Sequence, residues 1–108
     1  MTKQEYLNEG FQLFAKRAYD KAKENFEKAL DLDDKFEAAY SALSETLNRQ
    51  GHVDEAVEIV QKWIKINPKD ALAHTALSRL YVQKGMIMEA ETEMAISNQL
   101  AHDNSGME

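Results

Sequence analysis

Residues 37–70 read EAAYSALSETLNRQGHVDEAVEIVQKWIKINPKD, and this stretch decides the fold. In each half, apolar or small residues recur at three- and four-residue spacing, which places them on one face of a helix. They are Tyr40, Leu43, Ser44 and Leu47, followed by Val53, Ala56, Val57, Val60, Ile64 and Ile66. Gly51 stands between the halves, where glycine can take the left-handed conformation that ends one helix and turns the chain. The stretch therefore predicts two helices joined by a short turn.

The same pattern recurs at a step of 34 residues, which separates Ala22, Ala56 and Ala90. Many other positions keep this step in order. They include Tyr6, Tyr40 and His74; Leu13, Leu47 and Tyr81; Phe26, Val60 and Met94; and Leu32, Ile66 and Leu100. A fixed period held without insertion or deletion is typical of repeat architectures. The sequence therefore predicts an all-α domain, 1–104, with three copies (3–36, 37–70 and 71–104) and six helices of about 12–14 residues.

Small residues set the turns and the closest helix contacts. Gly85 repeats the place of Gly51, whereas the first copy has Arg17 there, so that turn carries a conformational cost. Small side chains also let the two helices of a pair approach closely, near the lower end of the usual ~8–10 Å. The pairs that we expect to face one another are Gly10 and Ala22, Ser44 and Ala56, and Ser78 and Ala90.

Helix starts are marked by capping residues. Thr2 with Glu5, and Asp34 with Glu37, have the spacing of capping boxes at the starts of two first helices. Pro68 has no amide hydrogen and is tolerated in a first helical turn, so the fifth helix is expected to start nearby.

Composition and charge limit the functions open to the chain. Its 108 residues suit one compact unit, and a net charge of −6 disfavours nucleic acid and anionic membrane as partners. The absence of cysteine excludes disulfides and thiolate metal sites. The polar start, MTKQEYLNEG, has no signal-peptide pattern, and no apolar run approaches the ~18 residues of a membrane span. We therefore expect a soluble, cytoplasmic protein.

Motifs for catalysis are missing from the sequence. It has no Gly-rich phosphate loop, no nucleophile elbow and no metal-protease helix motif. Glu89, Glu91 and Glu93 alternate along a helix and point to different faces, which is typical of a solvated charge run. We expect no enzyme activity, no cofactor and no metal.

The pattern resembles the tetratricopeptide repeat, whose signature is an aromatic residue, Leu-Gly, Tyr, Gly, Tyr, Ala, Phe, Ala and Pro at fixed offsets. The matching residues are Tyr6, Gly10, Tyr19, Ala22, Phe26 and Ala29, then Tyr40, Leu43, Gly51, Ala56 and Pro68, then Leu77, Tyr81, Gly85 and Ala90. The resemblance covers 3–104 and concerns the fold, because the signature residues are structural. It implies a right-handed superhelical array whose first helices line the concave side.

The chain departs from the family at Trp63 and at its C-terminal end. Trp63 stands where alanine is usual, so it must either splay repeats two and three apart or lie against small neighbours such as Ala73 and Ala76. The family often adds a seventh helix, for which the final HDNSGME is too short and polar, so we expect a disordered tail at 105–108. Helix six is instead expected to cap the array, because polar residues replace apolar ones there. These residues are Glu91, Ser97 and Asn98.

The resemblance implies a scaffold or adaptor that binds a peptide or helix of a partner protein in the concave groove. The implied groove residues are Leu7, Phe11, Phe14, Ser41, Glu45, Asn48, Arg49, Thr75, Arg79 and Gln83. By helical phase they lie off the packing faces and are free to contact a ligand. Phe11 and Phe14 are the expected anchors, since aromatic residues commonly dominate binding energy. The alternative for Phe14 is that it folds back onto the second helix as core.

One subgroup of the family captures the C-terminal carboxylate of chaperones through a Lys, Asn, Asn, Lys, Arg constellation. At the matching places this chain has Leu7, Phe11, Ala42, Leu72 and Ala76. We therefore expect no carboxylate clamp, and a partner segment with apolar anchors instead.

Self-association is the alternative function. Met86 and Met88 flank Ile87, which we expect to be a core residue, at places that are small or polar in the other copies. Exposed methionines make adaptable contact surfaces. This edge is therefore a candidate for a homo-oligomer contact, although the two side chains packing locally at the chain end is an equal alternative.

Overall fold

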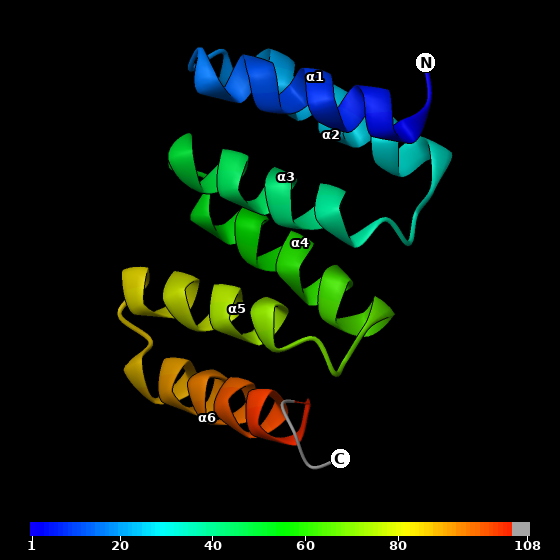
Figure 1. The fold of residues 1–108 in the computed structure, drawn as a ribbon. Coiled ribbons are helices and arrows are strands. Elements are labelled where there is room, and N and C mark those ends of the chain that lie inside the picture. The colour runs from blue at the N-terminus through cyan, green and yellow to red at the C-terminus, as the bar shows by residue number, and fades with distance from the viewer. Residues whose placement is uncertain (105–108) are drawn as a thin grey trace.

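The computed structural model describes residues 1–104, which form an all-α helical repeat array without strands. The helices are α1 (Lys3–Ala15), α2 (Tyr19–Leu32), α3 (Glu37–Arg49), α4 (Val53–Ile66), α5 (Ala71–Gln83) and α6 (Ile87–Asn104). They stack in chain order from the α1/α2 pair to the α5/α6 pair (Figure 1). Equivalent helices start 34 residues apart, as the sequence period predicts. The expected tail, 105–108, lies outside the described residues.

The core is one continuous cluster that runs through all three helix pairs. Phe26 and Val60 are fully buried on α2 and α4, and Leu77 on α5 is only 3% exposed. The shortest dimension of the molecule is 21 Å, which equals two helices of ~10 Å lying side by side. The core therefore lies between a layer of first helices and a layer of second helices.

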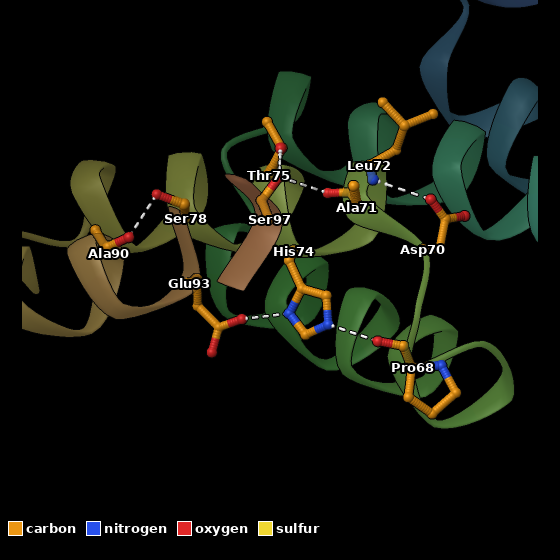
Figure 2. Close-up of polar contacts among 10 residues, drawn as sticks. All are labelled: Pro68, Asp70, Ala71, Leu72, His74, Thr75, Ser78, Ala90, Glu93 and Ser97. Atoms are coloured by element: carbon orange, nitrogen blue, oxygen red, sulfur yellow. Dashed lines mark hydrogen bonds and ion pairs between the residues drawn. The ribbon is translucent and has the colours of Figure 1, made fainter. Parts of the chain in front are cut away.

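Close approach within the helix pairs depends on small residues, but one predicted pairing is wrong. Ser78 Oγ donates a 2.7 Å hydrogen bond to the Ala90 carbonyl oxygen, so α5 and α6 meet where expected (Figure 2). Gly10, however, faces the Phe26 ring and not Ala22: a Cβ at Gly10 would lie 2.7 Å from Phe26 Cδ1 and 2.9 Å from Cζ. The missing side chain of Gly10 makes room for an aromatic ring.

The turns within each pair adopt the left-handed conformation that was predicted. Gly51 has φ of 84° and Gly85 has φ of 77°. Arg17 takes the same conformation at φ of 64°, where a residue with a Cβ pays roughly 1–2 kcal/mol. The conformational cost expected for the first turn is confirmed.

One of the two predicted capping boxes is present. Thr2 Oγ1 accepts from the Glu5 amide at 3.1 Å, and the Thr2 amide donates to Glu5 Oε1 at 2.8 Å. The Asp34–Glu37 box is wrong, because the N-cap of α3 is Phe36 and no side chain caps it.

Glu37 is unavailable for capping because it reaches across to α4. Its Oε1 accepts a 2.8 Å hydrogen bond from Trp63 Nε1 and a 3.2 Å bond from Asn67 Nδ2. The hydrogen bond from Trp63 is the main reason that the pKa of Glu37 lies below its ordinary value. Trp63 is 4% exposed and belongs to the same core as the fully buried Ala73. The indole thus packs into the core among small neighbours.

The 34-residue period also governs polar contacts between neighbouring pairs. Gln50 Nε2 donates to Asp20 Oδ1 at 2.6 Å, and one step further Lys84 Nζ donates to Asp54 Oδ1 at 2.5 Å. Each contact links the turn of one pair to the start of the preceding second helix. These bonds are surface contacts, so they set register more than they add stability.

A histidine keeps the hydrogen bond that a tyrosine makes one repeat earlier. Tyr40 Oη donates to the Asp34 carbonyl at 2.7 Å, and His74 Nε2 donates to the Pro68 carbonyl at 3.0 Å. Figure 2 shows that His74 Nδ1 also faces Glu93 Oε1, at 2.7 Å. Glu93 is therefore half-buried in an ion pair, and assigning it to a solvated charge run was wrong.

Helix α6 differs from the other second helices because no further pair of described helices lies beyond it. Glu91 and Asn98 are exposed, as expected of a polar end. Ser97 is not: it is 5% exposed and donates to the Ala71 carbonyl at 2.9 Å, so it faces α5 (Figure 2). Ile87 is 50% exposed, so its prediction as a core residue was wrong. At 18 residues α6 also exceeds the expected length.

Candidate functional site

Three residues at equivalent places mark the face formed by the first helices. Phe11 on α1, Glu45 on α3 and Arg79 on α5 are 34 residues apart, so each occupies the same position in its helix pair. Phe11 lines a hollow beside α3, Arg79 lines a hollow beside the other side of α3, and Glu45 lines both. We call these two adjoining hollows the groove.

The first hollow, between α1 and α3, is mainly apolar and has a volume of about 660 Å³. Its lining comprises Phe11, Phe14, Phe26, Ala38, Ser41, Ala42 and Glu45, and we call it the phenyl hollow. Phe26 is fully buried, and the ring of Phe11 meets it edge to face at 5.5 Å between centroids. Phe11 itself remains 48% exposed. A large apolar group is thus presented to solvent with a rigid ring behind it.

The second hollow, between α3 and α5, is polar and smaller, at about 280 Å³. Its lining comprises Ser44, Glu45, Asn48, Ala76, Arg79, Leu80 and Gln83, and we call it the donor hollow. Three of these side chains, Asn48, Arg79 and Gln83, carry N–H donors on neighbouring turns of the two helices. The groove therefore changes from apolar to hydrogen-bonding along its length.

An ion pair stands where the two hollows meet. Arg49 Nε lies 2.9 Å from Glu45 Oε2, and the guanidinium lies 5.6 Å from the centroid of the Phe14 ring. The hydrogen bond to Glu45 and the charge of that carboxylate raise the pKa of Arg49. Phe14 is also packed edge to face against Tyr19, the first residue of α2, at 5.3 Å. Phe14 is half-buried and thus serves both the core and the wall of the groove.

Most residues expected in the groove do lie there. Seven line the two hollows: Phe11, Phe14, Ser41, Glu45, Asn48, Arg79 and Gln83. Arg49 covers the junction between the hollows. The helical phase of the first helices therefore predicted their surface correctly at these positions.

Two residues expected in the groove are not free to contact a ligand. Leu7 is 4% exposed and belongs to the core, because at this phase a large apolar side chain turns inward, whereas Ser41 at the equivalent place stays exposed. Thr75 is half-buried, and its hydroxyl forms a hydrogen bond with Ser97 Oγ of α6 (Figure 2). Both assignments are corrected: Leu7 is a core residue and Thr75 joins α5 to α6.

Sequence reasoning missed part of the wall. Phe26 and Ala38 line the phenyl hollow, and Val82 on α5 is 54% exposed. The period carried a signal for two of them. Val82 stands one step after Asn48 and two after Phe14, and Ala38 stands one step before Leu72. Phe26 was missed because it belongs to a second helix whose ring passes over Gly10.

The proposed self-association edge is only partly exposed. Met88 is 80% exposed, whereas Met86 is half-buried and lies in the turn, where its amide donates to the Tyr81 carbonyl. Met88 stands one step after Asp54 and two after Asp20, the two residues that accept bonds from the next helix pair. The period thus places an apolar residue at the last acceptor position.

The fold and the groove together define a solenoid of helical hairpins with a cleft along its first helices. Residues 13–80, more than half of the chain, match the family model described as tetratricopeptide repeat. The chain belongs to the tetratricopeptide repeat family. No curated protein sequence matches it.

Solved structures with the same fold are distant in sequence. MamA is 22% identical with a TM-score of 0.91, and the match covers 96% of this chain but only 61% of the MamA chain. The type III secretion translocator chaperone SycD of Yersinia enterocolitica is 17% identical with a TM-score of 0.90, over 95% of this chain and 77% of that one. The first TPR of Spaghetti (RPAP3), bound to the HSP90 peptide SRMEEVD, is 15% identical with a TM-score of 0.87, over 96% and 82%. At these identities the likeness establishes the fold.

Membrane spanning was also assessed. Among residues 1–104 no helix combines the length and the apolar character needed to cross a membrane.

Proposed function

We propose that the chain is a non-enzymatic scaffold or adaptor that binds a peptide or helix of a partner protein in the groove. The observation that carries this proposal is Phe11, which is 48% exposed at the mouth of the phenyl hollow. A large aromatic side chain held in solvent over an apolar recess is typical of a binding hot spot. An apolar side chain of the partner would enter the phenyl hollow and cover this ring.

Two of the solved relatives support a peptide as the ligand class. One SycD structure is a complex with a peptide of the translocator YopD, and the RPAP3 structure contains an HSP90 peptide. A carboxylate clamp is not part of our proposal, because the matching places here hold Leu7, Phe11, Ala42, Leu72 and Ala76. None of these side chains carries a charge that could hold a chain-end carboxylate.

Phe11→Ala should weaken peptide binding at least tenfold while leaving stability nearly unchanged. The ring contributes contact surface in the groove, and truncating an aromatic anchor commonly costs about 2 kcal/mol of binding energy or more, a factor above ten. The probe is a random twelve-residue peptide library displayed on phage and selected on the wild-type chain. Selected peptides are then synthesised with fluorescein and an amidated C-terminus, and their affinities are measured by fluorescence anisotropy.

The matched control for this variant is Leu32→Ala, which also removes an exposed apolar side chain, 57% exposed, but lies at the end of α2 outside the groove. It should leave the affinities unchanged. Thermal unfolding by circular dichroism should give the same midpoint for both variants within a few degrees. Peptides that bind Phe11→Ala as tightly as wild type, or an unfolded Phe11→Ala protein, would contradict the proposal.

Self-association is a second candidate, favoured by the 80% exposure of Met88 beside the half-exposed Ile87 at the end of the array. If this edge joins two copies, sedimentation of the wild type should show a dimer that grows with protein concentration. Met88→Gln should then weaken the dimer several-fold, because it removes apolar contact area, whereas Leu32→Gln should not. A wild-type chain that sediments as a monomer over the whole concentration range rules out this candidate.

A further inference from the structure

The donor hollow contains a cation that the protein leaves unpaired. The Arg79 side chain is exposed and makes no hydrogen bond or ion pair within residues 1–104. Arg49, the other groove arginine, is different because it is bound to Glu45 and lies over Phe14. Glu45 cancels the charge of Arg49, so the groove keeps a net positive charge at Arg79. This local sign is opposite to the chain's net charge of −6.

Two neutral donors accompany Arg79. The side-chain amides of Asn48 and Gln83 line the same hollow of about 280 Å³ and likewise make no hydrogen bond with described residues. A guanidinium can hold a carboxylate through two parallel hydrogen bonds, and adjoining amide N–H groups can complete the coordination of its oxygens. A hollow with three unused donors and one unpaired cation has the chemistry of a carboxylate site.

We propose that the partner segment carries an aspartate or glutamate whose side chain binds Arg79, flanked by Asn48 and Gln83, while an apolar residue occupies the phenyl hollow. This inference rests on the proposed function and adds the chemistry of the partner. The source is a side-chain carboxylate, since charge complementarity is confined to this hollow and the family's chain-end positions are apolar in this chain.

The separation of the two hollows sets the spacing within the partner. They lie on either side of α3, so their centres are about one helix separation apart, ~10 Å. An extended segment covers this distance in about three residues at ~3.3 Å each. A helical segment needs about seven residues, or two turns, at ~1.5 Å each. The acidic residue should therefore follow or precede the apolar anchor by about three or about seven positions.

A double-mutant cycle between protein and peptide tests the contact. The probes are the phage-selected, amidated peptides described above, each paired with a version in which the acidic residue is changed to its amide. On the wild-type chain the amide version should bind about tenfold more weakly. On Arg79→Gln the acidic peptide should be weakened by a similar factor, and the amide version should bind no differently from it. The advantage of the acidic peptide on the wild type should also shrink as salt is raised.

Controls separate this contact from general electrostatics and from the groove itself. Lys16→Gln removes an exposed cation at the end of α1, outside the groove, and should leave the difference between acidic and amide peptides intact. Phe11→Ala should weaken both peptide versions by the same factor. Arg79 is exposed, so the unfolding midpoint of Arg79→Gln should match that of the wild type.

The outcomes distinguish the two proposals. If selected peptides depend on Phe11 but show no acidic residue, or are indifferent to Arg79→Gln, the carboxylate inference falls and the proposed function stands. If no peptide is selected, or binding is indifferent to Phe11→Ala, both fall. A further arm uses the same peptides with a free C-terminus. If only this form responds to Arg79→Gln, the carboxylate belongs to a chain end and the side-chain assignment is overturned.

Discussion

Replacing Trp63 with alanine is expected to lower the free energy of unfolding by about 3–5 kcal/mol, the usual cost of removing a large buried aromatic side chain. The indole is 4% exposed in a core that runs through all three helix pairs. Its Nε1 also donates to Glu37, so truncation leaves a partly buried carboxylate without its principal donor. Because domains of this size are stable by only about 5–15 kcal/mol, the variant should be close to unfolding at 37 °C.

The measurement is urea unfolding followed by circular dichroism, since the variant has lost the chain's single tryptophan. Trp63→Phe separates the two contributions, because it keeps most of the packing and removes the hydrogen bond. It should cost about 1–2 kcal/mol, which is typical for one hydrogen bond to a charged group plus a small volume change. A Trp63→Ala protein within 1 kcal/mol of wild type would show that the indole is not part of the core.

Gly10→Ala is expected to have the second largest effect, a loss of about 2 kcal/mol, although alanine is the better helix former by about 1 kcal/mol. The added methyl would lie 2.7 Å from Phe26 Cδ1 and 2.9 Å from Cζ. Phe26 is fully buried and cannot swing into solvent. Its ring would be displaced toward Phe11, which it contacts at 5.5 Å, so the phenyl hollow should change shape as well.

A compensating change identifies this clash as the cause. Phe26→Leu removes the ring and should cost about 1–2 kcal/mol by itself. In the Gly10→Ala/Phe26→Leu double variant the methyl has room, so the combined loss should be smaller than the sum by about 1 kcal/mol. Additive losses, measured by urea unfolding of all four proteins, would show that the two residues do not compete for space.

The regular part of the fold was predictable because it depends on local chemistry repeated at a fixed step. Helical phase identified the six helices, and Gly51 and Gly85 identified two of the turns, since a left-handed residue is needed there. The Thr2–Glu5 capping box was found for the same reason, because its partners are three residues apart. The Asp34–Glu37 box failed, as Glu37 has a better partner 26 residues away in Trp63.

The candidate site was predictable only where the helix phase decides exposure. Phe11, Glu45 and Arg79 share one phase and all line the groove. Leu7 and Thr75 share another phase that lies at the edge of the packing face, where the side chain itself decides whether it turns inward. No local pattern announces such borderline positions, because the outcome depends on the space left by neighbouring helices.

The period, the helices and their turns are thus legible in the chain, since each follows from residues within a few positions of one another and is repeated three times. The contacts that give each copy its individual character arose only from packing. Examples are the Phe26 ring over Gly10, the Glu37–Trp63 bond and the His74–Glu93 pair. So did the pairing of Arg49 with Glu45 while Arg79 stays unpaired. Each depends on distances between helices, which long-range packing sets and no single repeat contains.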